Sequence, residues 1–186
     1  MQINKEFLKS LKPCADRYKV FLKHHADFDG SLSEFLDLPN LEYGDKAWVA
    51  ERVLNKNQAI KWATLCAESV VHIFEEQCPG NKHPRDCIDF LKTVNDFNNL
   101  TETEKLEIEK HKDIIGDYYS TSAANYATSA AHYALYSDVY NAAFAAHYAV
   151  YAATHSANAA SDSIESDAKQ KQEALNLQFL KQVISL

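Results

Sequence analysis

Helical periodicity dominates the pattern of apolar and polar positions along the chain. It is clearest in residues 57–77, where apolar side chains recur every three or four positions, as on the buried face of a helix. These side chains are Ile60, Ala63, Ala67, Val70, Val71 and Phe74. Residues 3–25 show the same period, but Pro13 interrupts it. Because proline removes a helical hydrogen bond, we expect either two short helices or one kinked helix there.

Capping signals divide the rest of the N-terminal segment. Residues 27–30 and 40–44 are expected to be loops. Between them, the stretch 31–34 (SLSE) forms a capping box, which predicts a short helix ending before Pro39. Asp45 is expected to cap the following helix, which has the sequence KAWVAERVL.

Breakers and a second capping box separate the helices of the middle segment. Pro79-Gly80 is expected to end the long helix, and Pro84 suits the first turn of the next one. Asn98-Asn99 is expected to end that helix in turn. The stretch 101–104 (TETE) is a capping box, so a further helix is predicted to begin there.

The C-terminal segment is rich in alanine and nearly free of helix breakers. No proline interrupts it, and Gly116 is its only glycine. Two similar heptapeptides, AAHYALY at 130–136 and AAHYAVY at 145–151, are offset by about four helical turns. They are either two stretches of one long helix or parts of two antiparallel helices, of which Ser137-Asp138 caps the second.

Alanine on nearly every turn lets helices approach closely, so we expect this region to be packed on more than one side. Its aromatic rings suit either a core in which alanine faces an aromatic ring, or a binding surface. The rings are Tyr126, Tyr133, Tyr136, Tyr140, Phe144, Tyr148 and Tyr151. The last helix is expected to be capped at Ser161-Asp162 or at Ser166-Asp167. Its apolar stripe is Leu175, Leu177, Phe179, Leu180 and Val183.

These patterns predict an all-α fold, a compact multi-helix bundle with alanine-rich central helices. The length of 186 residues fits one domain, and four glycines with four prolines are too few for the turns of an all-β fold. We expect a single helical domain over residues 1–186. It comprises N-terminal helices and loops (1–44), a helical hairpin region (45–100) and long Ala/Tyr-rich helices (101–186). No segment is apolar enough to span a membrane.

Charge and cysteine content limit the partners and the cellular compartment that we expect for the protein. The net charge of −7 excludes nucleic-acid binding driven by general charge attraction. The first residues lack the apolar stretch of a signal peptide, so we expect a cytoplasmic protein with reduced thiols. Cys66 lies in an apolar segment and is expected to be buried. A disulfide between Cys78 and Cys87 is left open as the less favoured alternative.

No arrangement of residues points to catalysis or to a metal. Four polar residues share one face of the 57–77 helix: Glu68, His72, Glu75 and Glu76. A di-iron bundle needs Glu-x-x-His motifs, which the sequence lacks, so a polar edge is the favoured interpretation. His147 and His155 would lie about 12 Å apart along a helix, too far to share one metal ion. Phosphate loops, nucleophile elbows and zinc-protease motifs are missing, so no catalytic residue and no cofactor is expected.

Arg85 is the residue whose position most clearly calls for a partner of opposite charge. It directly follows Pro84 at a predicted helix start, where the helix dipole disfavours a cation. We expect a bidentate ion pair with Glu68 or Glu75 on the preceding helix to compensate. The alternative is that Arg85 contacts an anionic ligand or partner.

The segment around this hairpin resembles a known family. It reads Trp62-Ala63-x-x-Cys66-Ala67-Glu68, then Phe74-Glu75, Pro79, His83-Pro84-Arg85 and Ile88. The resemblance is to a family of small helical immunity proteins encoded beside bacterial polymorphic toxins and in phage genomes, and it covers about residues 45–186. Where the family pattern has D-x-R-P-R, this chain has Asn81-Lys82-His83-Pro84-Arg85, without the Asp and the first Arg. The resemblance implies binding rather than catalysis.

The function predicted on this basis is that of a non-enzymatic binding protein. It would neutralise an effector by occlusion, the effector being a toxin or, if the gene is viral, a host-defence component. The residues expected to contact it are Glu68, Glu75, His83, Arg85, Tyr133, His147, Tyr148 and Tyr151. The alternatives are a small-molecule binder, such as a sponge for a nucleotide signal, and a metal-dependent enzyme using His72 or the His132, His147 and His155 set. Neither nucleic acid nor a membrane is expected as a partner, and self-association into a homo-oligomer is left open.

Overall fold

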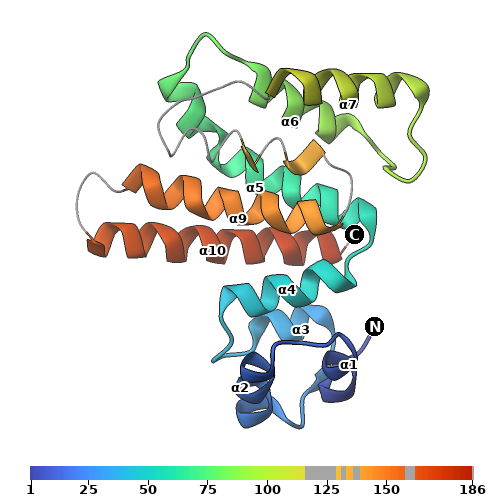
Figure 1. Ribbon diagram of the computed structural model, residues 1–186, viewed down its shortest axis with the longest axis vertical. Coiled ribbons are helices and arrows are strands. Elements are labelled where there is room, and N and C mark those ends of the chain that lie inside the picture. Colours follow the sequence, from blue (N-terminus) through green and yellow to red (C-terminus); the bar gives the residue numbers. More distant parts are fainter. Residues whose placement is uncertain (116–128, 131–132, 136–138, 158–161, 186) are drawn as a thin grey trace.

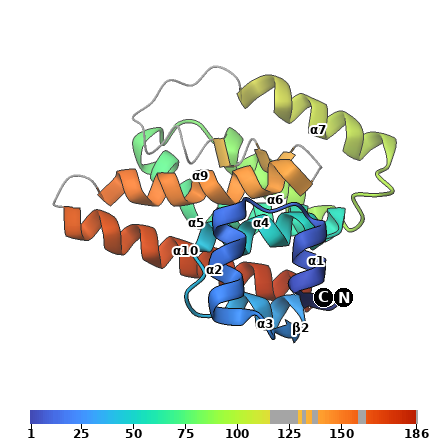
Figure 2. The same cartoon turned by 60° about the horizontal axis from the view of Figure 1, so that its bottom comes forward.

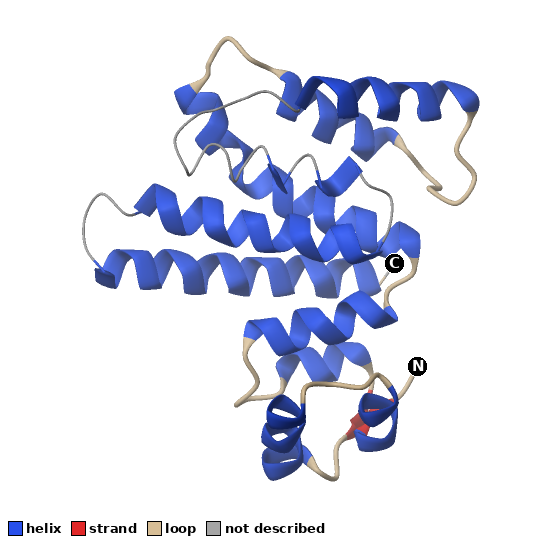
Figure 3. Cartoon of the chain, in the orientation of Figure 1, coloured by secondary structure: helices blue, strands red, loops and turns tan. Residues whose placement is uncertain are grey.

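The computed structural model describes residues 1–115, 129–130, 133–135, 139–157 and 162–185 (Figure 1). In these residues the fold is all-α, as predicted, with one minor two-stranded pairing (Figure 3). The elements are β1 (Ile3–Asn4), α1 (Lys5–Ser10), α2 (Ala15–His25), β2 (Asp29–Gly30), α3 (Leu32–Asp37), α4 (Tyr43–Val53), α5 (Lys56–Gln77), α6 (His83–Thr93), α7 (Glu102–Ile115), α9 (Val139–Ala157) and α10 (Asp162–Ile184).

The bundle is centred on α5, whose predicted apolar face is fully buried. Helix α5 packs against α9, α10 and α6, and α9 lies beside α10 in both views (Figures 1 and 2). The short helices α1 to α3 gather at one end, beyond α4, while α6 and α7 lie at the other end (Figure 1). Every helix that the structure describes is too short or too polar to span a membrane.

Most helix ends follow the local signals in the sequence. The break between α1 and α2 contains Pro13, so the two-helix alternative for residues 3–25 is confirmed. Ser31 and Glu34 form the predicted capping box of α3, with the Ser31 N–H donating to Glu34 Oε2 at 2.7 Å. Glu104 Oε2 accepts the Thr101 N–H at 2.7 Å in the same way before α7.

Three local predictions are wrong. Residues 29–30, expected in a loop, pair as β2 with β1, Ile3 opposite Gly30. A Cβ at Gly30 would lie 2.8 Å from the Phe28 ring, so the close approach needs glycine. Helix α4 begins at Tyr43, inside the expected loop 40–44, and Asp45 is not its N-cap but lies in its first turn, its carboxylate accepting the Glu42 N–H at 3.2 Å. Helix α6 ends at Thr93, several residues before Asn98-Asn99.

The two heptapeptides of the alanine-rich segment belong to different structural units. Tyr133 and Tyr148 occupy equivalent positions in them, and their rings stack with centroids 5.0 Å apart. On one continuous helix these positions would be about 22 Å apart, so the single-helix alternative is wrong. Helix α9 begins at Val139. The predicted cap at Ser137-Asp138 lies outside the described residues.

The buried face of α10 differs from the predicted apolar stripe. Leu180 and Val183 are buried as expected, but Leu175, Leu177 and Phe179 are only half-buried. The remaining buried positions, one and two helical turns before Leu180, are polar: Asn176 and Gln172. The helix begins at Asp162, so Ser166-Asp167 lies inside it and is not its cap, while Ser161 lies outside the described residues.

A hydrogen-bonded cluster replaces apolar packing where α10 crosses α4, α5 and α9. Asn176 Nδ2 donates to the Ala146 carbonyl at 2.9 Å and to the Tyr43 hydroxyl at 3.2 Å. Asn176 Oδ1 accepts from Gln172 Nε2 at 2.8 Å, and the same amide donates to Ser69 Oγ. The Asn176 carbonyl accepts from Trp62 Nε1 at 3.0 Å. One polar side chain thereby joins helices that are far apart in the sequence.

The cysteines follow the sequence-based expectation. Cys66 is fully buried, and burial raises the pKa of its thiol well above the usual value. No disulfide forms among the four cysteines, all of which lie in the described residues, so the Cys78–Cys87 alternative is wrong.

Candidate binding groove

The predicted Arg85 ion pair forms between α5 and α6. Arg85 Nε and Nη2 donate to the two carboxylate oxygens of Glu75 at 2.8 and 2.9 Å. This bidentate pairing lowers the pKa of Glu75. Glu68, the other expected partner, instead pairs with Lys92 at 2.5 Å. Two ion pairs therefore fasten α5 to α6, and both side chains of the Arg85 pair remain about one-third exposed, at 31% and 37%.

The structural role of this pair gives a first prediction. Replacing Arg85 with alanine is expected to lower the free energy of unfolding by about 1 kcal/mol, because the pair is bidentate but partly solvated. The melting temperature would fall by about 2–4 °C for a domain of this size. Thermal denaturation at low and high salt measures this change, and Lys61→Ala, on the same helix α5, serves as the control. An unchanged melting temperature combined with loss of partner binding would show that Arg85 serves recognition instead.

The predicted aromatic residues of the alanine-rich segment divide between core and surface. Tyr133 stacks against Tyr148 and against Phe144, and all three residues are half-buried, Tyr133 and Tyr148 against the core. Tyr151 is 40% exposed, and its hydroxyl lies 3.0 Å from His147 Nε2. The core interpretation is therefore confirmed for Tyr133 and Tyr148, whereas Tyr151 is exposed and its role in binding stays a prediction. Tyr126, Tyr136 and His132 lie outside the described residues.

His147 and Tyr151 open onto a groove of about 740 Å³ between the start of α4, α9 and α10. Its further lining residues are Leu41, Glu42, Tyr43, Gly44, Val150, Thr154, Glu165, Lys169 and Glu173. A neighbouring hollow of about 270 Å³ shares Tyr43, Gly44 and His147 with it. That hollow adds Ala47, Trp48, Glu51 and Phe144. The two hollows form one surface, which we call the acidic groove.

The charge of the acidic groove is negative at neutral pH. Among its described lining residues, four glutamates face a single lysine: Glu42, Glu51, Glu165, Glu173 and Lys169. Lys169 Nζ lies 3.9 Å from Glu173 Oε1. Arg17 and Arg52, which do not line the groove, lie 3.0 Å from Glu42 and 3.5 Å from Glu51, so these cations offset part of the negative charge. Desolvation, followed by the charge of Lys169, lowers the pKa of His147, so this ring is neutral at pH 7.

Two groove carboxylates are partly buried, and the cations beside them do not fully offset the cost of burying their charge. Burial raises the pKa of Glu173, despite the opposing effect of Lys169. Burial likewise raises the pKa of Glu51, although Arg52 lies close to it. A cation entering the groove would stabilise the charged forms of both side chains. The groove is therefore suited to a positively charged ligand.

The hairpin and the groove are separate surfaces. Glu68, Glu75, His83 and Arg85 do not line the groove among the described residues, and His83 N–H donates to Asn81 Oδ1 at 3.0 Å at the start of α6. The groove residues on α4 and α10 were not foreseen, because no local motif links segments more than 100 positions apart. Within the described residues, no three His, Cys, Asp or Glu side chains are grouped to hold a metal ion.

In comparisons with known proteins, no family model, curated protein or solved structure matches this chain.

Proposed function

We propose that this chain is a non-enzymatic binding protein that neutralises a basic protein effector by covering its functional surface with the acidic groove. The effector is a toxin or, if the gene is viral, a component of host defence. The observation that carries the proposal is the groove itself, in which Glu42, Glu165 and Glu173 line the same hollow as the exposed Tyr151 and His147. Aromatic side chains at the centre of a charged surface are typical of protein interfaces.

Electrostatics support a cationic protein partner over a nucleotide. A net charge of −7 accelerates encounter with a basic target, and charge complementarity then disfavours other partners. A phosphate group would meet repulsion from the groove glutamates, with Lys169 the one cation among its described lining residues. The groove chemistry therefore disfavours the nucleotide sponge that the sequence left open.

Isosteric neutralisation of the groove tests this proposal. The tagged protein is purified under native conditions from the cells that encode it and is analysed by native mass spectrometry. The double variant Glu165→Gln/Glu173→Gln is expected to weaken retention of the bound polypeptide by at least about tenfold. The double variant should fold normally, because an uncharged glutamine at position 173 avoids the free-energy cost of partly burying the Glu173 carboxylate.

The matched control removes the same charge elsewhere. Glu102→Gln/Glu109→Gln, on the exposed face of α7, is expected to retain the polypeptide as the wild type does. Co-expression of the retained polypeptide in a sensitive strain then measures neutralisation as growth. Equal retention by both double variants would contradict the groove as the contact surface. A retained mass of only a few hundred daltons would contradict the protein partner.

A further inference from the structure

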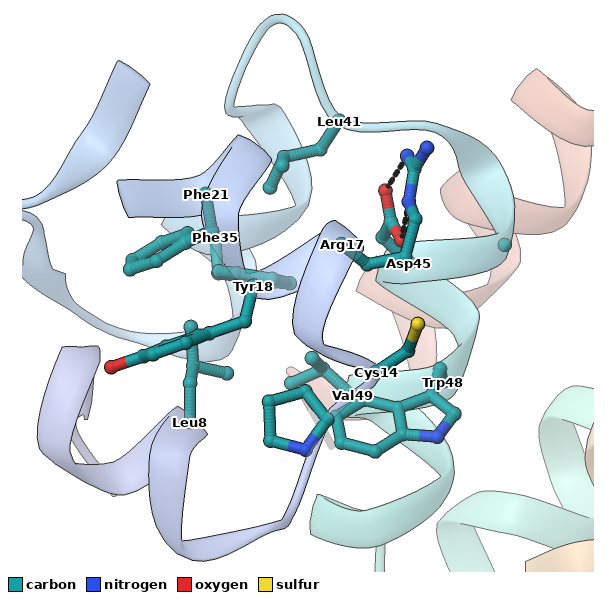
Figure 4. Close-up of a pocket in the computed structure, with 12 residues that line it drawn as sticks. Leu8, Cys14, Arg17, Tyr18, Phe21, Phe35, Leu41, Asp45, Trp48 and Val49 are labelled. Carbon is teal, nitrogen blue, oxygen red and sulfur yellow. Dashed lines mark hydrogen bonds and ion pairs between the residues drawn. The ribbon is translucent and has the colours of Figure 1, made fainter. Parts of the chain in front are cut away.

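An apolar pocket lies among the N-terminal helices (Figure 4). It lies between α2, α3 and α4 and encloses about 160 Å³. Elsewhere, an apolar cavity of about 150 Å³ holds one benzene ring. Its walls are mainly hydrocarbon: Leu8, Tyr18, Phe21, Phe35, Leu41, Trp48 and Val49. We call this pocket the apolar socket.

Polar contacts around the rim hold the socket open in a fixed shape. Arg17 Nε donates to Asp45 Oδ1 at 2.8 Å, which joins α2 to α4, and Arg17 Nη1 donates to Glu42 Oε1 at 3.0 Å. The guanidinium carbon of Arg52 lies 3.9 Å from the centre of the Trp48 ring. Because these contacts fix the walls before a ligand arrives, binding costs little conformational entropy in the protein.

The socket and the acidic groove lie side by side and share wall residues. Leu41 and Gly44 line both, and Trp48 lines the socket and the smaller hollow of the groove. The space beside Gly44 is empty, since a Cβ built there meets no atom within 4 Å. The shared wall at Gly44 therefore places the two hollows close enough for one bound segment to contact both.

We propose that the apolar socket takes one apolar side chain, of phenylalanine or leucine size, from the same cationic segment of the partner protein that occupies the acidic groove. This inference rests on the proposed function and specifies the partner's bound segment as an apolar anchor flanked by lysine or arginine. Charge complementarity selects this occupant, because two carboxylates at the rim, Glu42 and Asp45, share the single guanidinium of Arg17, and the Glu42 side chain is 76% exposed. Interfaces commonly concentrate their affinity in one such anchor within a preformed pocket.

A small probe with the same chemistry tests the socket without the partner. 2-Phenylethylamine carries an aromatic ring and an ammonium group, whereas phenylacetate carries the ring with the opposite charge. The fluorescence of Trp48 reports binding, since Trp62, the second of the two tryptophans, is fully buried in the bundle. We expect saturable fluorescence change with 2-phenylethylamine, and binding of phenylacetate weaker by at least about fivefold. No saturation, or equal binding of the two probes, would overturn the proposal.

Gly44 provides a matched pair of variants for the same titration. Gly44→Phe fills the junction of socket and groove with a ring and is expected to weaken 2-phenylethylamine binding by at least about tenfold. Gly44→Ala adds only a methyl group in open space, within a helix where Gly44 has no positive φ, and should bind as the wild type does. Circular dichroism checks that both variants fold, and equal binding by both would overturn the socket.

Retention of the natural partner separates the failure of this inference from the failure of the proposed function. In native purification, Gly44→Phe is expected to lose the polypeptide that Gly44→Ala retains. If Gly44→Phe retains it fully, the anchor assignment is overturned while the groove proposal stands. If even the wild type retains no polypeptide, the proposed function fails, and the protein anchor with it, although the amine titration still identifies a cation-selective socket.

Discussion

Replacing Asn176 with alanine is expected to lower the free energy of unfolding by about 3 kcal/mol. Asn176 is fully buried, and its side chain bonds the Tyr43 hydroxyl, the Ala146 carbonyl and the Gln172 amide. Loss of a partner for buried polar groups costs about 1–3 kcal/mol for each group left unsatisfied. At about 2–4 °C per kcal/mol, the melting temperature would fall by about 6–12 °C.

Two variants separate the effect of losing this cross-link from the effect of truncating any side chain on α10. Gln178→Ala removes an amide side chain from the exposed face of the same helix and is expected to change stability by less than about 0.5 kcal/mol. Tyr43→Phe deletes one hydroxyl of the cluster and is expected to lower the free energy of unfolding by about 1 kcal/mol. Equal melting temperatures for Asn176→Ala and Gln178→Ala would contradict the arrangement of the polar cluster.

The polar cluster also marks the limit of sequence-based reasoning about the fold. Helix caps such as Ser31 with Glu34 depend on neighbours three residues apart, so the sequence could predict them. The face of α10 that is buried depends on what α4, α5 and α9 place opposite it. Apolar residues alone suggested Leu175, Leu177 and Phe179, whereas hydrogen bonds from distant helices allow Asn176 and Gln172 to be buried instead.

The candidate site shows the same division between local and distant information. The Arg85–Glu75 pair was predictable, because a poorly placed cation after Pro84 needs a carboxylate on the adjacent helix of the same hairpin. The approach of His147 and Tyr151 follows from their spacing of four residues. The groove itself was not predictable, since Glu42 and Glu173 come together only through tertiary packing.

The position of the groove depends on how closely α9 packs against its neighbours. Among the α9 side chains that the structure describes, four alanines are fully buried, at the spacing of one helix face: Ala145, Ala146, Ala149 and Ala152. Small side chains at this spacing allow short distances between helix axes. His147 and Tyr151 lie on the same helix but turn toward the groove. A larger side chain on the alanine face would therefore move α9 away from the bundle and alter the groove.

Replacing Ala149 with leucine is accordingly expected to lower the free energy of unfolding by about 2–3 kcal/mol through overpacking. The melting temperature would fall by about 4–12 °C, and Ala146→Leu should behave alike because Ala146 is equally buried. Ala174→Leu, on the exposed face of α10, adds the same three carbon atoms and should change stability by less than about 0.5 kcal/mol. If Ala149→Leu were as stable as Ala174→Leu, α9 would not pack on the bundle through its alanines. His147 and Tyr151 would then lose the support that holds them at the acidic groove, and the groove could not be the preformed surface from which the binding function is inferred.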